Sequence, residues 1–193
     1  MSKPQLIKSS GWFFVAGAFA FITMLSGSDP IAIPGSVVSA ILLAVAMSRL
    51  RAAYGDSVGR FGRSFLMIGV LAPVLWLIVI ASMVGRVTEA QVNEGLWVVI
   101  FAGPAISLLG LTLFGLAALI SRPMPRLNWL PVIAGIWYPV MFTLFSIYDI
   151  SHKGKFPHQY VPELISIVMI QFLALCILGF VLIDDSSKEL VTA

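Results

Sequence analysis

Residues 64–85 read SFLMIGVLAPVLWLIVIASMVG and contain no Asp, Glu, Lys, Arg or His. A helix needs about 20 apolar residues to cross the hydrocarbon core of a bilayer. A barrel strand needs only about 10 residues and alternates in polarity, which this stretch does not do. The stretch is therefore predicted to be a transmembrane helix.

Five further runs share this character, and the composition of the whole chain agrees with them. Hydrophobic residues make up 59% of the 193 residues and charged residues only 11%, against roughly 25% in soluble domains. Mean hydropathy is +0.99. Charged side chains enter the runs only near an end, at Arg49 and Glu163. The six runs cover residues 11–27, 31–50, 64–85, 96–120, 127–148 and 162–183. We predict an all-α, polytopic bundle of six transmembrane helices that forms one domain over residues 1–193.

The positive charges predict how the chain is oriented. Short connections such as residues 28–30 and 122–126 make consecutive helices antiparallel, which gives three hairpins with both termini on one side. That side carries nine of the twelve Lys and Arg residues: Lys3, Lys8, Arg49, Arg51, Arg60, Arg63, Arg122, Arg126 and Lys188. Only Arg86, Lys153 and Lys155 fall on the other side. Because cytoplasmic loops are enriched in Lys and Arg, both termini are predicted to lie in the cytoplasm. The size and the charge bias fit a multi-pass protein of a bacterial cytoplasmic membrane.

The first run also has features of a signal peptide. Lys3 and Lys8 precede a short apolar segment that ends in small residues near Ser26 and Ser28. No Ala-x-Ala cleavage site ends the segment, which favours a retained first helix. Cleavage there would leave five spans and an external N-terminus.

Neutral hydrogen-bonding side chains fall near the middle of several runs. If they face one another, they form a polar pocket with aromatic walls. The alternative is that Gln171 bonds to a neighbouring helix and holds the bundle together, because a side-chain amide in hydrocarbon needs a partner. The candidate pocket residues are Ser39, Trp76, Ser107, Trp137, Tyr138 and Gln171.

Small residues recur every four positions along the second run, at Ser36, Ala40, Ala44 and Ser48. Such a stripe lets another helix backbone approach closely. It predicts either helix packing within one chain or a contact with a second copy or another protein.

The segment from Tyr54 to Arg63 is glycine-rich and basic, but it lacks the Gly-Lys-Ser/Thr ending and the preceding strand of a P-loop. Basic residues at a cytoplasmic surface attract anionic lipid headgroups, by about 1 kcal/mol each. We therefore expect headgroup contacts at Arg49, Arg51, Arg60, Arg63, Arg122 and Arg126.

No catalytic, cofactor or metal site is predicted. The runs hold no paired carboxylates, no Ser/His pair and no His-Glu-x-x-His. The outer loop carries His152 and His158, but two lysines and a proline lie between them, and the spacing fits no established metal site. Proton-coupled transport normally needs an ionisable side chain inside the membrane. An enzyme is therefore not expected, and nothing indicates a nucleic-acid partner.

One resemblance rests on short motifs around the inner connections. They are Arg49-Leu50-Arg51, Gly59-Arg60-Phe61-Gly62-Arg63, Pro125-Arg126 and Trp129 at the start of the fifth run. In these motifs the chain resembles uncharacterised bacterial six-span membrane proteins, over about two-thirds of its length. The resemblance implies a shared fold and no activity.

Two functions remain open from the sequence. The first is a helical scaffold or accessory subunit that acts through lipid and protein contacts. The second is binding or passive transport of a small neutral or lipophilic molecule through the midplane residues.

Overall fold

The computed structural model describes residues 1–23, 29–83, 97–124, 127–151 and 161–191. These residues form six α-helices, and no strand occurs among them. The helices are α1 (Lys3–Ile22), α2 (Asp29–Tyr54), α3 (Gly59–Met83), α5 (Trp97–Ser121), α6 (Leu130–Ser151) and α7 (Val161–Val191). Among the described residues, five helices are long and apolar enough to cross a membrane, and α6 carries a shorter apolar segment, Leu130–Leu144. The all-α fold and the multi-pass character predicted from the sequence are confirmed at this level.

Two helices run well past the apolar runs that predicted them. Helix α1 begins at Lys3 rather than at residue 11, and α7 continues to Val191 rather than ending at residue 183. At the start of α1 the backbone N–H of Ser2 donates to Oε1 of Gln5 at 3.0 Å, which caps the helix. In both extensions some side chains are buried, including Ile7 in α1 and Asp185 in α7. An apolar run marks the part of a helix that suits the membrane, whereas packing and capping decide where the helix ends.

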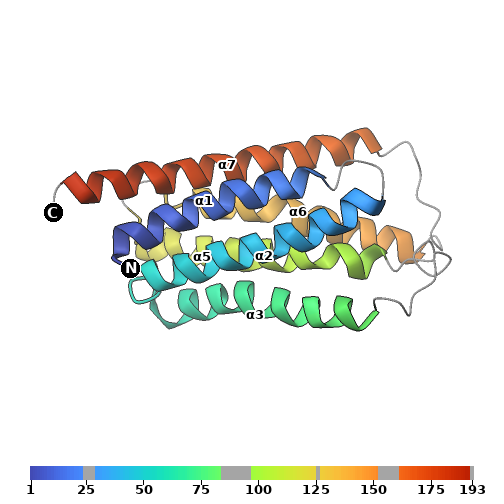
Figure 1. Cartoon of the computed structure of the whole chain (residues 1–193), viewed down its shortest axis with the longest axis horizontal. Coiled ribbons are helices and arrows are strands. Elements are labelled where there is room, and N and C mark those ends of the chain that lie inside the picture. Colours follow the sequence, from blue (N-terminus) through green and yellow to red (C-terminus); the bar gives the residue numbers. More distant parts are fainter. Residues whose placement is uncertain (24–28, 84–96, 125–126, 152–160, 192–193) are drawn as a thin grey trace.

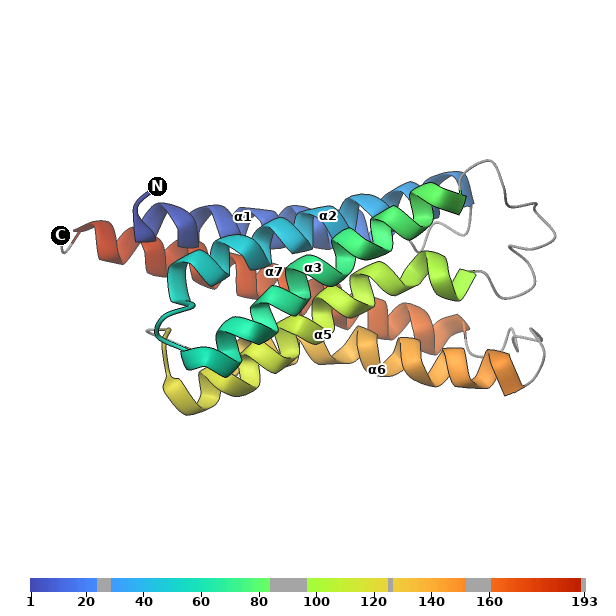
Figure 2. The same cartoon turned by 90° about the horizontal axis from the view of Figure 1, so that it is seen from below.

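The six helices pack side by side along their lengths. Helix α1 contacts both α2 and α7, α5 contacts α3 and α6, and the pairs α2 with α3 and α6 with α7 complete a ring. Helix α2 also contacts α5 across this ring. Figure 2 shows α3 at the front of the bundle, lying along α5. Figure 1 places both termini, the turn between α2 and α3, and the end of α5 at the same end of the molecule.

Glycines bring neighbouring helices into direct backbone contact. A Cβ atom added to Gly11 of α1 would lie 2.5 Å from the carbonyl oxygen of Gly179 in α7. One added to Gly110 of α5 would lie 2.6 Å from Cα of Gly69 in α3. Both distances are shorter than any Cβ contact in a relaxed protein, so only glycine fits at these crossings.

The contact between α5 and α6 uses the same device twice. A Cβ on Gly115 would lie 2.5 Å from the backbone nitrogen of Val132, and one on Gly135 would lie 2.5 Å from Oγ1 of Thr112. Gly115 is on α5 and Gly135 is on α6, so each helix has one glycine at which the other helix approaches closely. Close approach increases the van der Waals contact that drives helix association in lipid.

Serine hydroxyls join α1 to α2 at two levels. Ser10 Oγ donates to the carbonyl oxygen of Ala46 at 2.9 Å, and Ser39 Oγ donates to the carbonyl oxygen of Gly17 at 3.1 Å. All four residues are buried. Each hydroxyl therefore finds its acceptor within the bundle rather than in lipid.

The small-residue stripe of the second run lies mostly inside the molecule. Ser36, Ala40 and Ala44 are buried, whereas Ser48 is exposed. These positions fit packing within one chain. The homo-oligomer or partner contact through the stripe stays a prediction.

In the described part of the connection after α5, two residues have left-handed backbone angles, Arg122 with φ 48° and Leu127 with φ 53°. Left-handed angles cost a non-glycine residue about 1–2 kcal/mol. Next to Leu127, the side chain of Asn128 accepts a hydrogen bond from the backbone N–H of Met124 and donates one to its carbonyl oxygen, both at 3.0 Å. These two bonds fix Met124 and Asn128 relative to each other, which offsets part of this backbone strain.

We predict that Gly11→Val destabilises the protein by about 1–3 kcal/mol, because the new side chain must push α7 away from α1. Thermal unfolding in detergent, followed by circular dichroism, measures the loss. Ala16→Val is the matched control, since Ala16 is on the same helix but is exposed. Equal stability of the two variants would contradict the Gly11–Gly179 contact.

Candidate functional site

Gln171 on α7 bonds to the backbone of α6 and is fully buried. Its Oε1 accepts a hydrogen bond from the backbone N–H of Tyr138 at 3.0 Å, and its Nε2 donates to the carbonyl oxygen of Ala134. Positions 134 and 138 are four residues apart, which is the spacing of a hydrogen-bonded pair in an α-helix. The amide of Gln171 therefore lies across one turn of α6 and serves the donor and the acceptor of that turn.

This contact is made beside a proline inside α6. Pro139 follows Tyr138 directly and lies inside the helix. A proline has no backbone N–H and its ring clashes with the carbonyl group four residues earlier, which is that of Gly135. Gln171 thus supports the turn of α6 that the proline disturbs. Of the two interpretations of Gln171 from the sequence, this geometry fits the one in which its amide bonds to a neighbouring helix.

Aromatic side chains surround Tyr138, whose side chain is buried. Its ring meets the ring of Phe21 from α1 edge to face, with centroids 4.6 Å apart. The ring of Phe142, one turn further along α6, is 6.0 Å away. These contacts connect α1 with α6 through the interior of the bundle.

The other predicted pocket residues are distributed over different interfaces. Ser39 bonds to Gly17 between α1 and α2, as described above. Trp76 is buried against Gly103 of α5, where an added Cβ would lie 2.6 Å from the indole ring. Ser107 is buried, and its Oγ has no hydrogen-bond partner among the described residues. Trp137 is 42% exposed on the outside of α6. The fold thus brings Tyr138 and Gln171 together and places Ser39 and Trp137 elsewhere.

A second candidate site is an open cavity between α2 and α3, which we call the arginine pocket. It has a volume of about 300 Å³ and is lined by Arg51, Arg60, Arg63, Ser64 and Met67. Arg51 is in the last turn of α2, whereas the other four belong to the first three turns of α3. The short turn at residues 55–58 brings these two helix ends together.

The charges of the arginine pocket are poorly balanced by the protein itself. Nη1 of Arg63 lies 3.2 Å from Oδ1 of Asp56, in an ion pair whose carboxylate side chain is 99% exposed. Nε of Arg51 is buried and has no hydrogen-bond partner in the described part of the chain. For Arg60 the described residues offer no acidic partner within ion-pair distance. The pocket therefore keeps an excess of positive charge.

The start of α3 adds to this positive potential. The first turn of a helix carries unsatisfied backbone N–H groups and the positive end of the helix dipole, which acidic side chains usually balance. The first turn of α3 contains no acidic residue and carries Arg60 instead. Three guanidinium groups beside this helix start make the cavity electrostatically suited to an anion rather than a cation.

Two of the remaining predicted headgroup residues, Arg49 and Arg122, do not line the pocket. Nη1 of Arg49 contacts Sδ of Met1 at 2.6 Å, and Arg122 is exposed at the end of α5. Arg126 and the loop with His152 and His158 fall outside the described residues. Of the five predicted arginines that the structure describes, three share a cavity.

Sequence reasoning did not single out Ser64 or Met67 as neighbours of the arginines. The signal was present in the spacing, because residues 60, 63, 64 and 67 recur at intervals of three and four and so share one face of a helix. Arg51 lines the pocket because the turn at residues 55–58 brings the end of α2 against the start of α3, and helical periodicity does not predict such a contact.

Comparison with models of protein families, with characterised proteins and with solved structures finds no match to this chain.

We predict that Gln171→Leu lowers the stability of the folded protein by about 1 kcal/mol, the size of a typical hydrogen bond between membrane helices. The fold is retained, because residues 134 and 138 of α6 are spaced to bond to each other. Reversible unfolding in mixed detergent micelles measures the change. The control Ile170→Leu, at an exposed neighbour on α7, changes stability by less than about 0.5 kcal/mol. A Gln171→Leu variant as stable as this control would contradict the role of the amide.

Proposed function

We propose that this protein is a six-span membrane protein that serves as a helical scaffold or accessory subunit and acts through its lipid and protein contacts. The observation that carries this proposal is the use of interior polar groups for packing. Gln171 and Ser39 both bond to the backbone of an adjacent helix. Polar groups that are hydrogen-bonded to an adjacent helix hold the helices together and are not free to bind a ligand.

The glycine contacts support the same conclusion. Helices that touch through Gly11, Gly69, Gly110 and Gly179 have no room between their backbones at those crossings. A pathway for a solute needs separation between helices or a lined cavity. The alternative is a midplane pocket for a small neutral molecule. It is supported by the buried hydroxyl of Ser107, which has no hydrogen-bond partner among the described residues.

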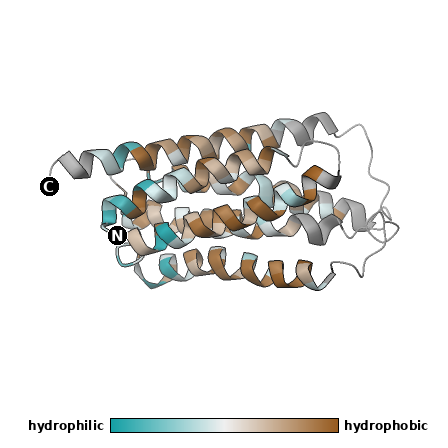
Figure 3. Cartoon of the chain, in the orientation of Figure 1, coloured by the Kyte–Doolittle hydropathy of each residue, from teal (hydrophilic) through white to brown (hydrophobic). Residues whose placement is uncertain are grey.

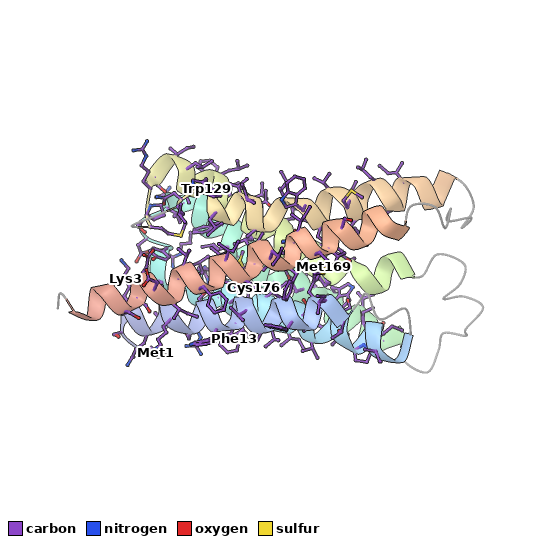
Figure 4. All side chains as sticks on the ribbon, turned by 90° about the horizontal axis from the view of Figure 1, so that it is seen from above. Met1, Lys3, Phe13, Trp129, Met169 and Cys176 are labelled. Carbon is purple, nitrogen blue, oxygen red and sulfur yellow. The ribbon has the colours of Figure 1, made fainter. Side chains whose placement is uncertain are left out.

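The orientation that we propose places both termini and the arginine pocket in the cytoplasm. Most described basic side chains, including Arg49, Arg51, Arg60, Arg63 and Arg122, belong to the helix ends gathered there. Figure 3 shows hydrophilic residues concentrated at this end and apolar residues along the helix middles. Figure 4 places Trp129 at the same end as Met1 and Lys3, and its side chain is exposed, as expected for an aromatic anchor at a membrane surface.

A labelling experiment tests the orientation. Cys176 is the only cysteine, so Cys176→Ser gives a background without thiols. In that background we predict that Ser57→Cys reacts with a membrane-impermeant maleimide only in inverted vesicles, and that Gly154→Cys reacts in intact cells. The reverse pattern would overturn the proposed orientation.

The scaffold role is tested by native mass spectrometry of the protein released directly from its membrane. We expect the chain to leave together with a second polypeptide, either another copy or a different protein. A stoichiometric non-lipid molecule of a few hundred daltons that is lost in Gln171→Leu would overturn this role and establish the pocket instead.

A further inference from the structure

The arginine pocket is more than a basic surface, because its charges converge on one cavity. Three guanidinium groups line about 300 Å³ of space, which is at the lower end of volumes that hold small ligands. Among the described residues, Asp56 is the only acidic side chain in an ion pair with any of them. One carboxylate against three guanidinium groups leaves an excess of two positive charges.

The donors around the cavity suit a phosphate group. Arginine presents planar pairs of N–H groups that match phosphate oxygens. Arg51 approaches from α2, whereas Arg60 and Arg63 approach from α3, so an anion between the helices meets donors from two sides. The hydroxyl of Ser64 belongs to the same lining, and it donates to the carbonyl oxygen of Arg60 at 3.0 Å.

One wall of the cavity is apolar, and it continues into exposed apolar surface of α3. Met67 lines the cavity and is 39% exposed. Beyond it the exposed residues Leu71, Leu75 and Ile78 follow at helical spacing along the same helix. A ligand with its phosphate among the arginines can therefore lay a hydrocarbon chain along α3. A free phosphate ion makes no use of this wall.

We propose that the arginine pocket binds one lipid whose headgroup carries two negative charges, either as a phosphate monoester or as two phosphodiesters. The two charges match the excess of the pocket, and the acyl chains lie on the apolar face of α3 beyond Met67. The proposal rests on the membrane embedding proposed above, but not on the scaffold role or the orientation. It turns a general attraction to anionic lipids into one stoichiometric site.

Native mass spectrometry of the purified full chain in detergent, with lipid added at known concentration, tests the proposal. The probes are phosphatidic acid, cardiolipin, phosphatidylglycerol and phosphatidylcholine. We expect one molecule of phosphatidic acid or cardiolipin per chain to bind at least about fivefold more tightly than singly charged phosphatidylglycerol, since one further charge near basic residues contributes about that factor. Preference between the two dianionic lipids identifies which form of phosphate the site takes. Equal binding of phosphatidylglycerol or phosphatidylcholine would overturn the charge match.

Substitutions locate the site. The double variant Arg51→Gln/Arg60→Gln is expected to bind the preferred lipid about 25-fold more weakly, or about fivefold per arginine. The control Arg49→Gln/Arg122→Gln removes the same charge from the same end of the protein but leaves the cavity intact. It is expected to lose less than about threefold, because separated surface charges are screened. Equal losses would mean a diffuse basic surface and would overturn the pocket.

Two further measurements keep the proposal testable if the double variant folds poorly. Asp56→Asn changes a side chain that is 99% exposed and releases Arg63 from its ion pair. This variant is expected to bind dianionic lipid about fivefold more tightly, and no gain would contradict the proposed charge balance.

Glycerol phosphate, which has the headgroup chemistry without acyl chains, is expected to compete poorly. Competition at concentrations equal to that of the lipid would identify a site for soluble phosphates and overturn the lipid assignment.

Discussion

Direct contact between helix backbones is the constraint on which this bundle depends. Lipid tails are as apolar as leucine, so exclusion from water does not press membrane helices together, and close van der Waals packing has to do so. At Gly11 against Gly179, and at Gly69 against Gly110, the backbones approach so closely that no Cβ fits. The same device operates between α5 and α6. The ring of helices is therefore held by glycine positions on α1, α3, α5, α6 and α7.

Polar side chains complete the interfaces that glycines open. Hydroxyl and amide groups in hydrocarbon need partners, and in this bundle the nearest partners are backbone carbonyl and N–H groups of the adjacent helix. Ser10 and Ser39 join α1 to α2, and Gln171 joins α7 to α6 beside Pro139. The proline disturbs a turn of α6 and the amide of Gln171 bonds to that turn, so the two residues make a matched pair from consecutive helices.

Charged side chains are concentrated at one end of the bundle. The interior is mostly apolar and closely packed, whereas both termini, the turn between α2 and α3 and the end of α5 lie together at one end, with the described arginines. The arginine pocket stands where these two regions meet, with guanidinium groups at the end of α2 and the start of α3 and with Met67 leading onto apolar surface. An amphiphilic ligand with a phosphate headgroup likewise has a charged end and an apolar end. This match is the physical basis of the proposed lipid site.

The sequence by itself determined the class of this protein, because runs of about 20 apolar residues have only one stable arrangement in a bilayer, the helix. It also identified Gln171 as a residue in need of a partner and the segment around Arg60 as a basic surface. Only the tertiary structure decided that Gln171 meets Ala134 and Tyr138, that Trp137 points outward, and that Arg51 shares a cavity with Arg63 while Arg49 does not. Helical periodicity reports which residues share a face of one helix. Which faces meet depends on where two backbones approach most closely, and that is a property of pairs of helices rather than of any single stretch of sequence.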